Sequence, residues 1–432
     1  MSERRLTGRS VSVPTLEFDV TVSLVERPEI VRDQKTLEEH CRRWRAAGVF
    51  AFDTEFIRDD TYEAALCLIQ VTADGTVTLV DPTDDVDPAP FWELVSDPTV
   101  VTVVHAGKED FEVCYRTTGR VPRNVFDVQI AAGFVGHGYP LSLARLVETL
   151  LHHRISKAQT LTDWLRRPLT AAQVRYAVED VLYLPEIYHR LRREIEQIGR
   201  TAWVAEEMKC FEDAEFYQAP VEERALRLKG SKRLDGLGLA VLERLIAWRE
   251  SWARSRNRPL RALMRDDVLV EIARRRPQRE SDLAVLRGFP QARNRKLVQE
   301  LIELIAEASK TPPAQWPQPP ERHDESPMGA AVLDLLSAIT QATCHEQRLS
   351  RHLLGGTSRL RELLDYHVGR TSALPEMLRG WRGEFIGRRL LEVVEGRSEI
   401  HLSGWPDDPR LTVVSHAPTE GALSPDPPPF RG

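Results

Sequence analysis

The chain has 432 residues, of which 42% are hydrophobic and 29% are charged. These fractions are typical of soluble globular protein and exclude extensive disorder, and the length corresponds to about three domains of roughly 150 residues each. The formal net charge of −6 does not by itself indicate a nucleic-acid partner.

Five scattered cysteines without a CxxC pair predict neither a disulfide framework nor a thiolate zinc site. No stretch reads as a membrane span, and the polar N-terminus is not followed by the apolar run of a signal peptide. We therefore expect a cytoplasmic protein with reduced cysteines and neither a membrane nor a disulfide partner.

Residues 1–30 show little periodicity and predict a loosely ordered N-terminus. From 31 to 215, strand-like and helix-like segments alternate. Runs rich in β-branched residues predict strands at 49–56, 65–72, 77–81 and 100–106. Helical patterns lie around 35–47, 108–117, 141–151 and 171–197. Three strands in quick succession, then a helix, another strand and mostly helices predict a mixed α/β sheet flanked by helices.

The strand signal disappears beyond about residue 222, and the rest of the chain divides by composition. Residues 221–310 read as several helices, followed by a semi-rigid linker at 311–328 that holds six prolines in eighteen residues. Residues 329–402 are again helical. The Pro-rich, acidic stretch 403–432 predicts a disordered tail.

The charge is unevenly distributed along the chain. Residues 221–310 contain 21 Lys+Arg and 13 Asp+Glu, a net charge of +8, which leaves −14 for the remainder. The arginines form two clusters: Arg254, Arg256, Arg258 and Arg261, then Arg274, Arg275, Arg276 and Arg279. A basic helical module beside an acidic α/β module suggests polyanion binding by the first, although an Arg-rich solvated surface has the same composition.

Carboxylates gather at the first predicted core strand. In FDTEF (residues 52–56) side chains alternate between the two faces, so Asp53 and Glu55 project together. Such neighbours repel each other unless a cation lies between them, a need that oxygen-ligated Mg²⁺ meets, whereas an edge strand would simply expose them to water. Asp110 falls in the first turn of the helix that begins near Lys108, where the helix dipole favours an acid in any case.

A further acid is predicted on the helix that follows residue 170. Thr170 and Gln173 have the spacing of a capping box, which starts a helix there. Tyr176 and Asp180 then lie one turn apart on one face, where a phenol and a carboxylate can share a water molecule. A surface aspartate beside a half-buried tyrosine would have the same spacing. Pro185 predicts that the helix kinks or ends soon after Asp180.

In their order, these segments resemble ribonuclease D, a family of the DEDD superfamily of 3′→5′ exonucleases, in its tyrosine-bearing subclass. The matching motifs are FDTEF, LCLIQV, HAGKEDFEVC, FDVQIAAGFVG, LTDWLRRPLT and YAVEDVLYL, within residues 31–215. Residues 225–308 resemble the nucleic-acid-binding HRDC domain, and residues 330–401, with LRGWRGEFIGRRLLEVVEG, resemble a more divergent second one. The resemblance implies a ribonuclease H-like exonuclease domain with a mixed sheet flanked by helices, followed by two all-α HRDC-like domains.

The resemblance also assigns roles to residues. The family's four metal-binding acids fall on Asp53, Glu55, Asp110 and Asp180, and its tyrosine falls on Tyr176. It implies two divalent ions, Mg²⁺ or Mn²⁺, and a hydroxyl that orients the attacking water. The family usually has Pro and a basic residue just before its LCLIQ strand, whereas this chain has YEAAL at 62–66, so a basic substrate contact is not expected there.

The function implied is a 3′→5′ exoribonuclease that trims RNA 3′ ends, such as those of tRNA precursors, and releases nucleoside 5′-monophosphates. The candidate RNA contacts are Lys157, Arg254, Arg256, Arg258, Arg274, Arg275 and Arg276. We expect a monomer. One alternative is a 3′→5′ deoxyribonuclease, which uses the same carboxylates. The other is a non-catalytic RNA-binding scaffold, for which a lost carboxylate would be expected and none is lost.

Overall fold

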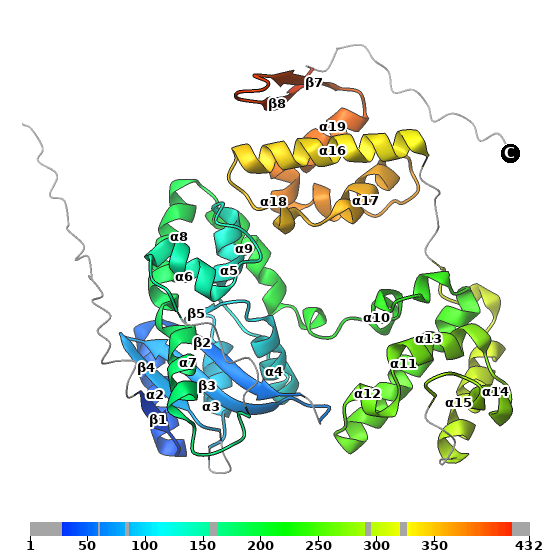
Figure 1. Ribbon diagram of the computed structural model, residues 1–432, viewed down its shortest axis with the longest axis horizontal. Helices are drawn as coiled ribbons and strands as arrows, with labels where there is room; N and C mark the ends of the chain where they lie inside the picture. The colour runs from blue at the N-terminus through cyan, green and yellow to red at the C-terminus, as the bar shows by residue number, and fades with distance from the viewer. Residues whose placement is uncertain are drawn as a thin grey trace, which may run out of the picture.

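The computed structural model describes residues 28–58, 61–82, 86–155, 163–289, 295–319 and 326–416. Figure 1 shows an α/β body in the N-terminal half, a helical body that holds α10 to α15, and a second helical body that holds α16 to α19. None of the helices in the described ranges is both long enough and apolar enough to cross a membrane.

The α/β body is built on a six-stranded sheet with the order β1-β4-β3-β2-β5-β6. The strands are β1 Glu29–Val31, β2 Val49–Ile57, β3 Ala65–Ala73, β4 Thr76–Val80, β5 Val101–Val104 and β6 Val125–Asp127. Strand β3 is antiparallel to both neighbours and the other pairs are parallel, which confirms the predicted mixed sheet. The expectation of a loose N-terminus is wrong for Glu29 and Ile30, because they pair with β4; residues 1–27 lie outside the described ranges.

Helices surround this sheet. They are α2 Gln34–Ala47, α3 Ala89–Val95, α4 Lys108–Thr118, α5 Val128–Phe134, α6 Leu143–Leu151, α7 Ala171–Leu182, α8 Leu184–Gln197 and α9 Thr201–Met208. On one face of β2 the Phe52 ring lies 5.2 Å from Phe91 and 5.8 Å from Phe111, centroid to centroid. This aromatic packing anchors β2, and the residues of opposite parity, Asp53 and Glu55, are left for the other face.

Helix α7 begins and ends where the sequence predicts. Thr170 and Gln173 form both hydrogen bonds of a capping box, which confirms the predicted start. The helix ends at Leu182, and α8 begins at Leu184 with Pro185 in its first turn. The break that Pro185 predicts is therefore confirmed, and it places Asp180 in the last turn of α7.

The basic helical module folds around a core of its own. Its helices are α10 Val221–Arg227, α11 Gly236–Arg256, α12 Leu260–Leu263, α13 Asp266–Arg275, α14 Glu280–Ala284 and α15 Arg295–Lys310. Leu242, Leu245, Leu269 and Leu301 are fully buried in a cluster that excludes the α/β body. The linker that follows contains a short turn of 3₁₀ helix at Pro313–Gln315 within its described part.

The second helical body shares the core of the α/β body. Its helices are α16 Pro327–Glu346, α17 Thr357–His367, α18 Gly380–Arg382 and α19 Arg388–Val394. The Trp381 and Phe134 rings lie 4.8 Å apart, and buried Arg200 donates hydrogen bonds to the carbonyl groups of Phe134 and Gln347. A continuous apolar cluster runs through both bodies, so they pack as one unit.

The prediction of an all-α second domain is wrong for residues 398–402, and the prediction of a disordered tail from residue 403 is wrong for residues 403–415. Strands β7 Ser398–Ser403 and β8 Arg410–Ser415 form an antiparallel hairpin. Apolar side chains alternate along both strands, and Ile400, Leu411 and Val413 pack against the shared core. That alternation outweighs the polar, Pro-rich composition on which the prediction rests. Residues 417–432 lie outside the described ranges.

Candidate active site

Three carboxylates converge between β2 and α7. Asp53 and Glu55 come from the non-aromatic face of β2, and Asp180 comes from the last turn of α7. Each offers one oxygen, and the three oxygens lie within 4.8 Å of one another. We call these three residues the carboxylate cluster. The predicted grouping of strand and helix acids holds for them.

Asp110 adjoins the carboxylate cluster but is held by a different partner. Its carboxylate accepts a hydrogen bond from the Thr54 backbone N–H at 3.1 Å and another from the Thr54 hydroxyl. Its charge nevertheless acts on Asp53, since it is the largest of the carboxylate influences on the Asp53 pKa. The charge of Asp110 also raises the pKa of Glu55 and of Asp180, so Asp110 lies near the carboxylate cluster without being one of its members.

Burial and mutual repulsion make this group of acids electrostatically unfavourable when charged. Burial and then the neighbouring carboxylates raise the pKa of Asp53 well above its usual value and that of Glu55 to about 8. Burial likewise raises the pKa of Asp110 and of Asp180 to about 7. Asp180 Oδ2 is buried without a hydrogen-bond partner in the described part of the chain. A hard divalent cation supplies the missing partner and the missing charge, so these residues fit a metal ion.

This electrostatics predicts how stability depends on pH. Because folding raises the pKa of Glu55 from its usual 4.5 to about 8, the folded protein binds the proton more tightly, and the metal-free protein should lose stability as pH rises through that interval. Added Mg²⁺ should offset the loss. We expect the increase in melting temperature on adding Mg²⁺ to be small at about pH 5 and largest at about pH 8, measured by calorimetry. An increase that does not depend on pH would contradict this assignment.

Tyr176 lies beside the carboxylate cluster. Its ring centroid is 5.9 Å from that of Trp164, and both side chains belong to a small apolar cluster between α7 and β3. Burial, followed by the charges of Asp180 and Glu55, raises the pKa of the Tyr176 phenol. The hydroxyl is thus held as a protonated donor next to the acids.

An ion pair between half-buried Arg167 and buried Asp81 fixes the segment that leads into α7. Arg167 donates from Nε and Nη2 to the two oxygens of Asp81, each at 2.6 Å, and from Nη2 to the Cys67 carbonyl at 2.8 Å. Asp81 is 1% exposed. The bidentate pair ties this segment to β3 and to the end of β4, and so sets where Tyr176 and Asp180 reach the sheet. Asp81 carries no sequence signal that would have singled it out.

Most of the predicted RNA contacts have partners within the chain. Arg274 and Arg275 both pair with Glu271, and Arg276 pairs with Asp235. The Arg256 guanidinium lies 4.9 Å from the Trp252 ring centroid. Arg258 is exposed just after α11, and Lys157 lies outside the described ranges. Among the described candidates, the contacts of these arginines join them to other residues than the carboxylate cluster.

Arg254 takes part in a contact between the α/β body and the basic helical module. Its guanidinium lies 5.7 Å from the ring of Tyr62, which stands in the β2–β3 connection. The Tyr62 hydroxyl donates to Glu250 at 2.8 Å, and the Tyr62 backbone N–H donates to Asn257 Oδ1 at 3.0 Å. The segment that departs from the family pattern thus contacts α11 of the basic module.

Comparison with known proteins shows which class of protein has this fold and this site. Residues 28–196 match a family model described as a 3′–5′ exonuclease, and residues 238–305 match the HRDC domain. The first match includes all four acids and Tyr176. The fold and the site therefore define a 3′→5′ exonuclease that carries an HRDC domain, and the metal dependence of such exonucleases agrees with the carboxylate cluster.

Full-length relatives narrow the class. The chain is 38% identical to ribonuclease D of Pseudomonas paraeruginosa over 376 residues, which are 86% of this chain and 99% of that protein. It is 31% identical to ribonuclease D of Bartonella henselae over 87% of this chain and 92% of that protein. The crystal structure of Escherichia coli RNase D, an exoribonuclease involved in structured RNA processing, matches with a TM-score of 0.76 at 28% identity, covering 86% of this chain and 99% of that one. The chain belongs to the ribonuclease D family: it is a 3′→5′ exoribonuclease, and its substrate is RNA.

Proposed function

We propose that this exoribonuclease trims the 3′ ends of structured RNAs, tRNA precursors among them, and releases nucleoside 5′-monophosphates with the help of two divalent ions, Mg²⁺ or Mn²⁺. The observation that carries the proposal is the half-buried carboxylate cluster with buried Asp110 beside it. The Escherichia coli relative is described as acting in structured RNA processing, which supports the substrate class.

We propose that the four acids are shared between two metal ions. The family resemblance assigns Asp53 to both ions, and the charges of Asp110, Asp180 and Glu55, which all raise its pKa, support that shared role. Glu55 and Asp180 would complete one site, and Asp110 would serve the other. Bound divalent ions lower the pKa of a water molecule and stabilise charge on the phosphate and on the departing 3′-oxygen.

The remaining residues of the site would orient the attacking water or hold the catalytic residues in place. Tyr176, with a phenol that is protonated at neutral pH, would donate a hydrogen bond that aims the attacking water at the terminal phosphodiester. Thr54 holds Asp110 in place, and the Arg167–Asp81 pair holds the segment before α7. The chain's own contribution is therefore to preorganise carboxylates and one hydroxyl around the scissile bond.

The HRDC domain would capture the RNA body. Its net positive charge supports contacts with phosphates by Arg254, Arg256, Arg258 and Arg274 to Arg276, with Lys157 as a candidate nearer the site. We propose that the enzyme acts as a monomer in the cytoplasm. All five cysteines are free thiols, which a reducing compartment preserves.

End-labelled RNA tests the proposed reaction. With Mg²⁺, a 5′-labelled strand should shorten one nucleotide at a time, and a 3′-labelled strand should release labelled nucleoside 5′-monophosphate from the first time point. Chelator should stop both. A matched DNA strand should react much more slowly. Internal cleavage, or hydrolysis that persists in chelator, would overturn the proposal, and faster hydrolysis of DNA would establish the deoxyribonuclease alternative.

A further inference from the structure

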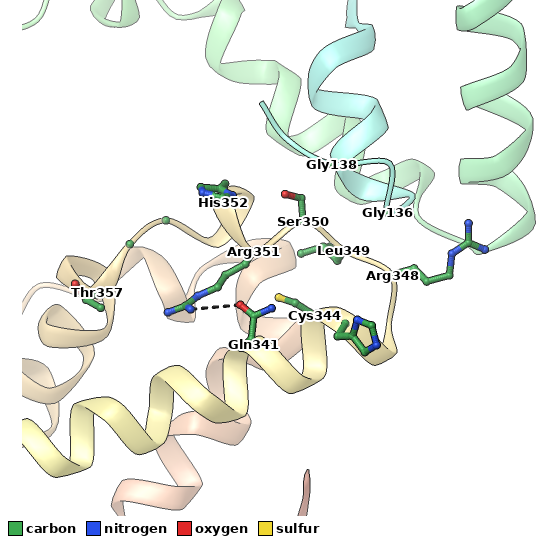
Figure 2. A pocket seen from close by; sticks show the side chains of 13 residues that line it. Gly136, Gly138, Gln341, Cys344, Arg348, Leu349, Ser350, Arg351, His352 and Thr357 are labelled. Atoms are coloured by element: carbon green, nitrogen blue, oxygen red, sulfur yellow. Dashed lines mark hydrogen bonds between the residues drawn. The ribbon is translucent and has the colours of Figure 1, made fainter. Parts of the chain in front are cut away.

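A pocket of about 790 Å³ lies where the second helical body meets the α/β body. One wall is formed by the C-terminal end of α16 and the segment 348–352 that follows it. The opposite wall is the loop after α5, with Gly136 and Gly138. Figure 2 shows this loop facing Leu349 and Ser350. The two bodies share one apolar core, so both walls are firmly placed.

The pocket is basic. Arg348, Arg351, His345 and His352 line it, and none of the described residues in its lining carries a carboxylate. The arginines have neutral partners: Arg348 donates to the Val135 carbonyl, and Arg351 donates to Ser337 Oγ at 2.6 Å and to Gln341 Oε1 at 3.3 Å.

These two arginines differ from the HRDC arginines described above. Arg274, Arg275 and Arg276 are offset by carboxylates of their own domain. At Arg348 and Arg351, by contrast, no carboxylate of the described chain offsets the positive charge. The pocket is therefore suited to an anionic ligand.

The pocket adjoins the edge of the sheet that carries the active site. Strands β2, β5 and β6 are parallel, so their carboxyl ends meet at one edge. His105 follows β5 directly and makes a hydrogen bond of 2.8 Å to the Leu141 carbonyl, in the same loop as Gly136 and Gly138. Asp110 follows His105 by five residues, in the first turn of α4, and reaches β2 at Thr54. The loop that walls the pocket is thus braced at the edge where the carboxylates gather.

We propose that this pocket binds backbone phosphates of the RNA strand upstream of the nucleotide being removed. The inference rests on the proposed function and adds a substrate subsite to it. Figure 2 shows Arg351 turned toward Gln341 on one side of the segment 348–352, while Arg348 extends from the segment's other end. Their separate directions suit successive phosphates of one strand better than a single small anion. The hydroxyl of Thr357 adds a donor in the lining, whereas that of Ser350 donates to the Tyr139 carbonyl at 3.3 Å.

Binding of single-stranded RNAs of increasing length to the full chain tests the proposal. Measurements in EDTA prevent hydrolysis. The double substitution Arg348→Gln and Arg351→Gln should weaken binding of a long strand by on the order of 10-fold while leaving a tetranucleotide unaffected. Since each phosphate contact on a single strand contributes about 0.7 to the salt slope, the slope should fall by about 1.4. The matched control, Arg388→Gln with Arg389→Gln on α19, removes the same charge outside the pocket and should change neither quantity.

Three further arms make the outcome decisive. A lysine pair, Arg348→Lys with Arg351→Lys, keeps the charge and should keep most of the affinity, and Arg351→Gln alone serves if the double variant melts early. Adenosine 5′-monophosphate and inorganic phosphate at millimolar concentration should not displace the long strand; displacement would identify a small-anion site and overturn the strand proposal.

Unchanged affinity and salt slope in the glutamine variant would also overturn it. Hydrolysis of the tetranucleotide in Mg²⁺ should be normal in every variant, and its absence in the wild type would refute the proposed function instead.

Discussion

Replacing Asp53 by asparagine should reduce hydrolysis of an RNA 3′ end by on the order of 10³-fold or more, to the level seen in chelator. Asparagine keeps the shape of the side chain and removes the charge that both proposed metal sites share. The stability of the folded protein should not decrease. Because the carboxylates repel one another, the metal-free variant should melt no lower than metal-free wild type, and Mg²⁺ should raise its melting temperature less.

Glu109→Gln is the matched control for this variant. Glu109 is an exposed acid in the first turn of α4, next to Asp110 in sequence but outside the carboxylate cluster. Its substitution should change the rate by no more than about twofold, as expected for screened surface charges. If Asp53→Asn hydrolyses RNA at a near-normal rate in Mg²⁺, the carboxylate cluster does not hold the catalytic metal.

Tyr176→Phe should reduce kcat by on the order of 10²-fold, the range typical of a group that positions or transfers a proton. Phenylalanine keeps the ring beside Trp164 and removes only the hydroxyl, so the attacking water is misdirected while metal and RNA still bind. The loss should therefore appear in kcat, with KM and the Mg²⁺ dependence little changed.

Tyr183→Phe provides the comparison for that result. Tyr183 caps the C-terminus of α7 and is also part-buried, but it does not belong to the apolar cluster that holds Tyr176. Its hydroxyl should be dispensable for the reaction. A Tyr176→Phe enzyme that is as fast as Tyr183→Phe would make Tyr176 a packing residue.

Local rules were sufficient to predict four of the five proposed catalytic residues, as two separate pairs. The alternation of side chains along β2 places Asp53 and Glu55 on one face, and the capping box sets the register in which Tyr176 lies one turn before Asp180. Bringing α7 over β2 is a tertiary event. For that step, the family resemblance supplied what spacing alone left open.

Contacts across long stretches of sequence were beyond such rules. Asp110 reaches Thr54 from 56 residues away, and Thr54 has the parity that points it away from Asp53. Arg167 reaches Asp81 across 86 residues. Each pair requires knowledge of which strands are neighbours and how deeply a loop is buried. Neither periodicity nor composition carries that information.

The predicted domain boundaries are wrong where the composition of a segment and its packing indicate different structures. The polar segment after Leu402 reads as a disordered tail, yet its alternating apolar side chains pack the β7–β8 hairpin against the shared core. The second helical body likewise reads as a separate domain, because nothing in the sequence shows that Trp381 packs edge to face with Phe134. That shared core gives the pocket between the two bodies its fixed walls.

The location of the metal tests the central claim most directly. Crystals of the protein soaked in Mn²⁺, with anomalous diffraction measured for manganese, should show a peak among the oxygens of Asp53, Glu55 and Asp180, and a second between Asp53 and Asp110 when an RNA 3′ end is present. Both peaks should be lost in Asp53→Asn. Manganese bound elsewhere, with the carboxylate cluster empty in a protein that still hydrolyses RNA in Mn²⁺, would contradict the account.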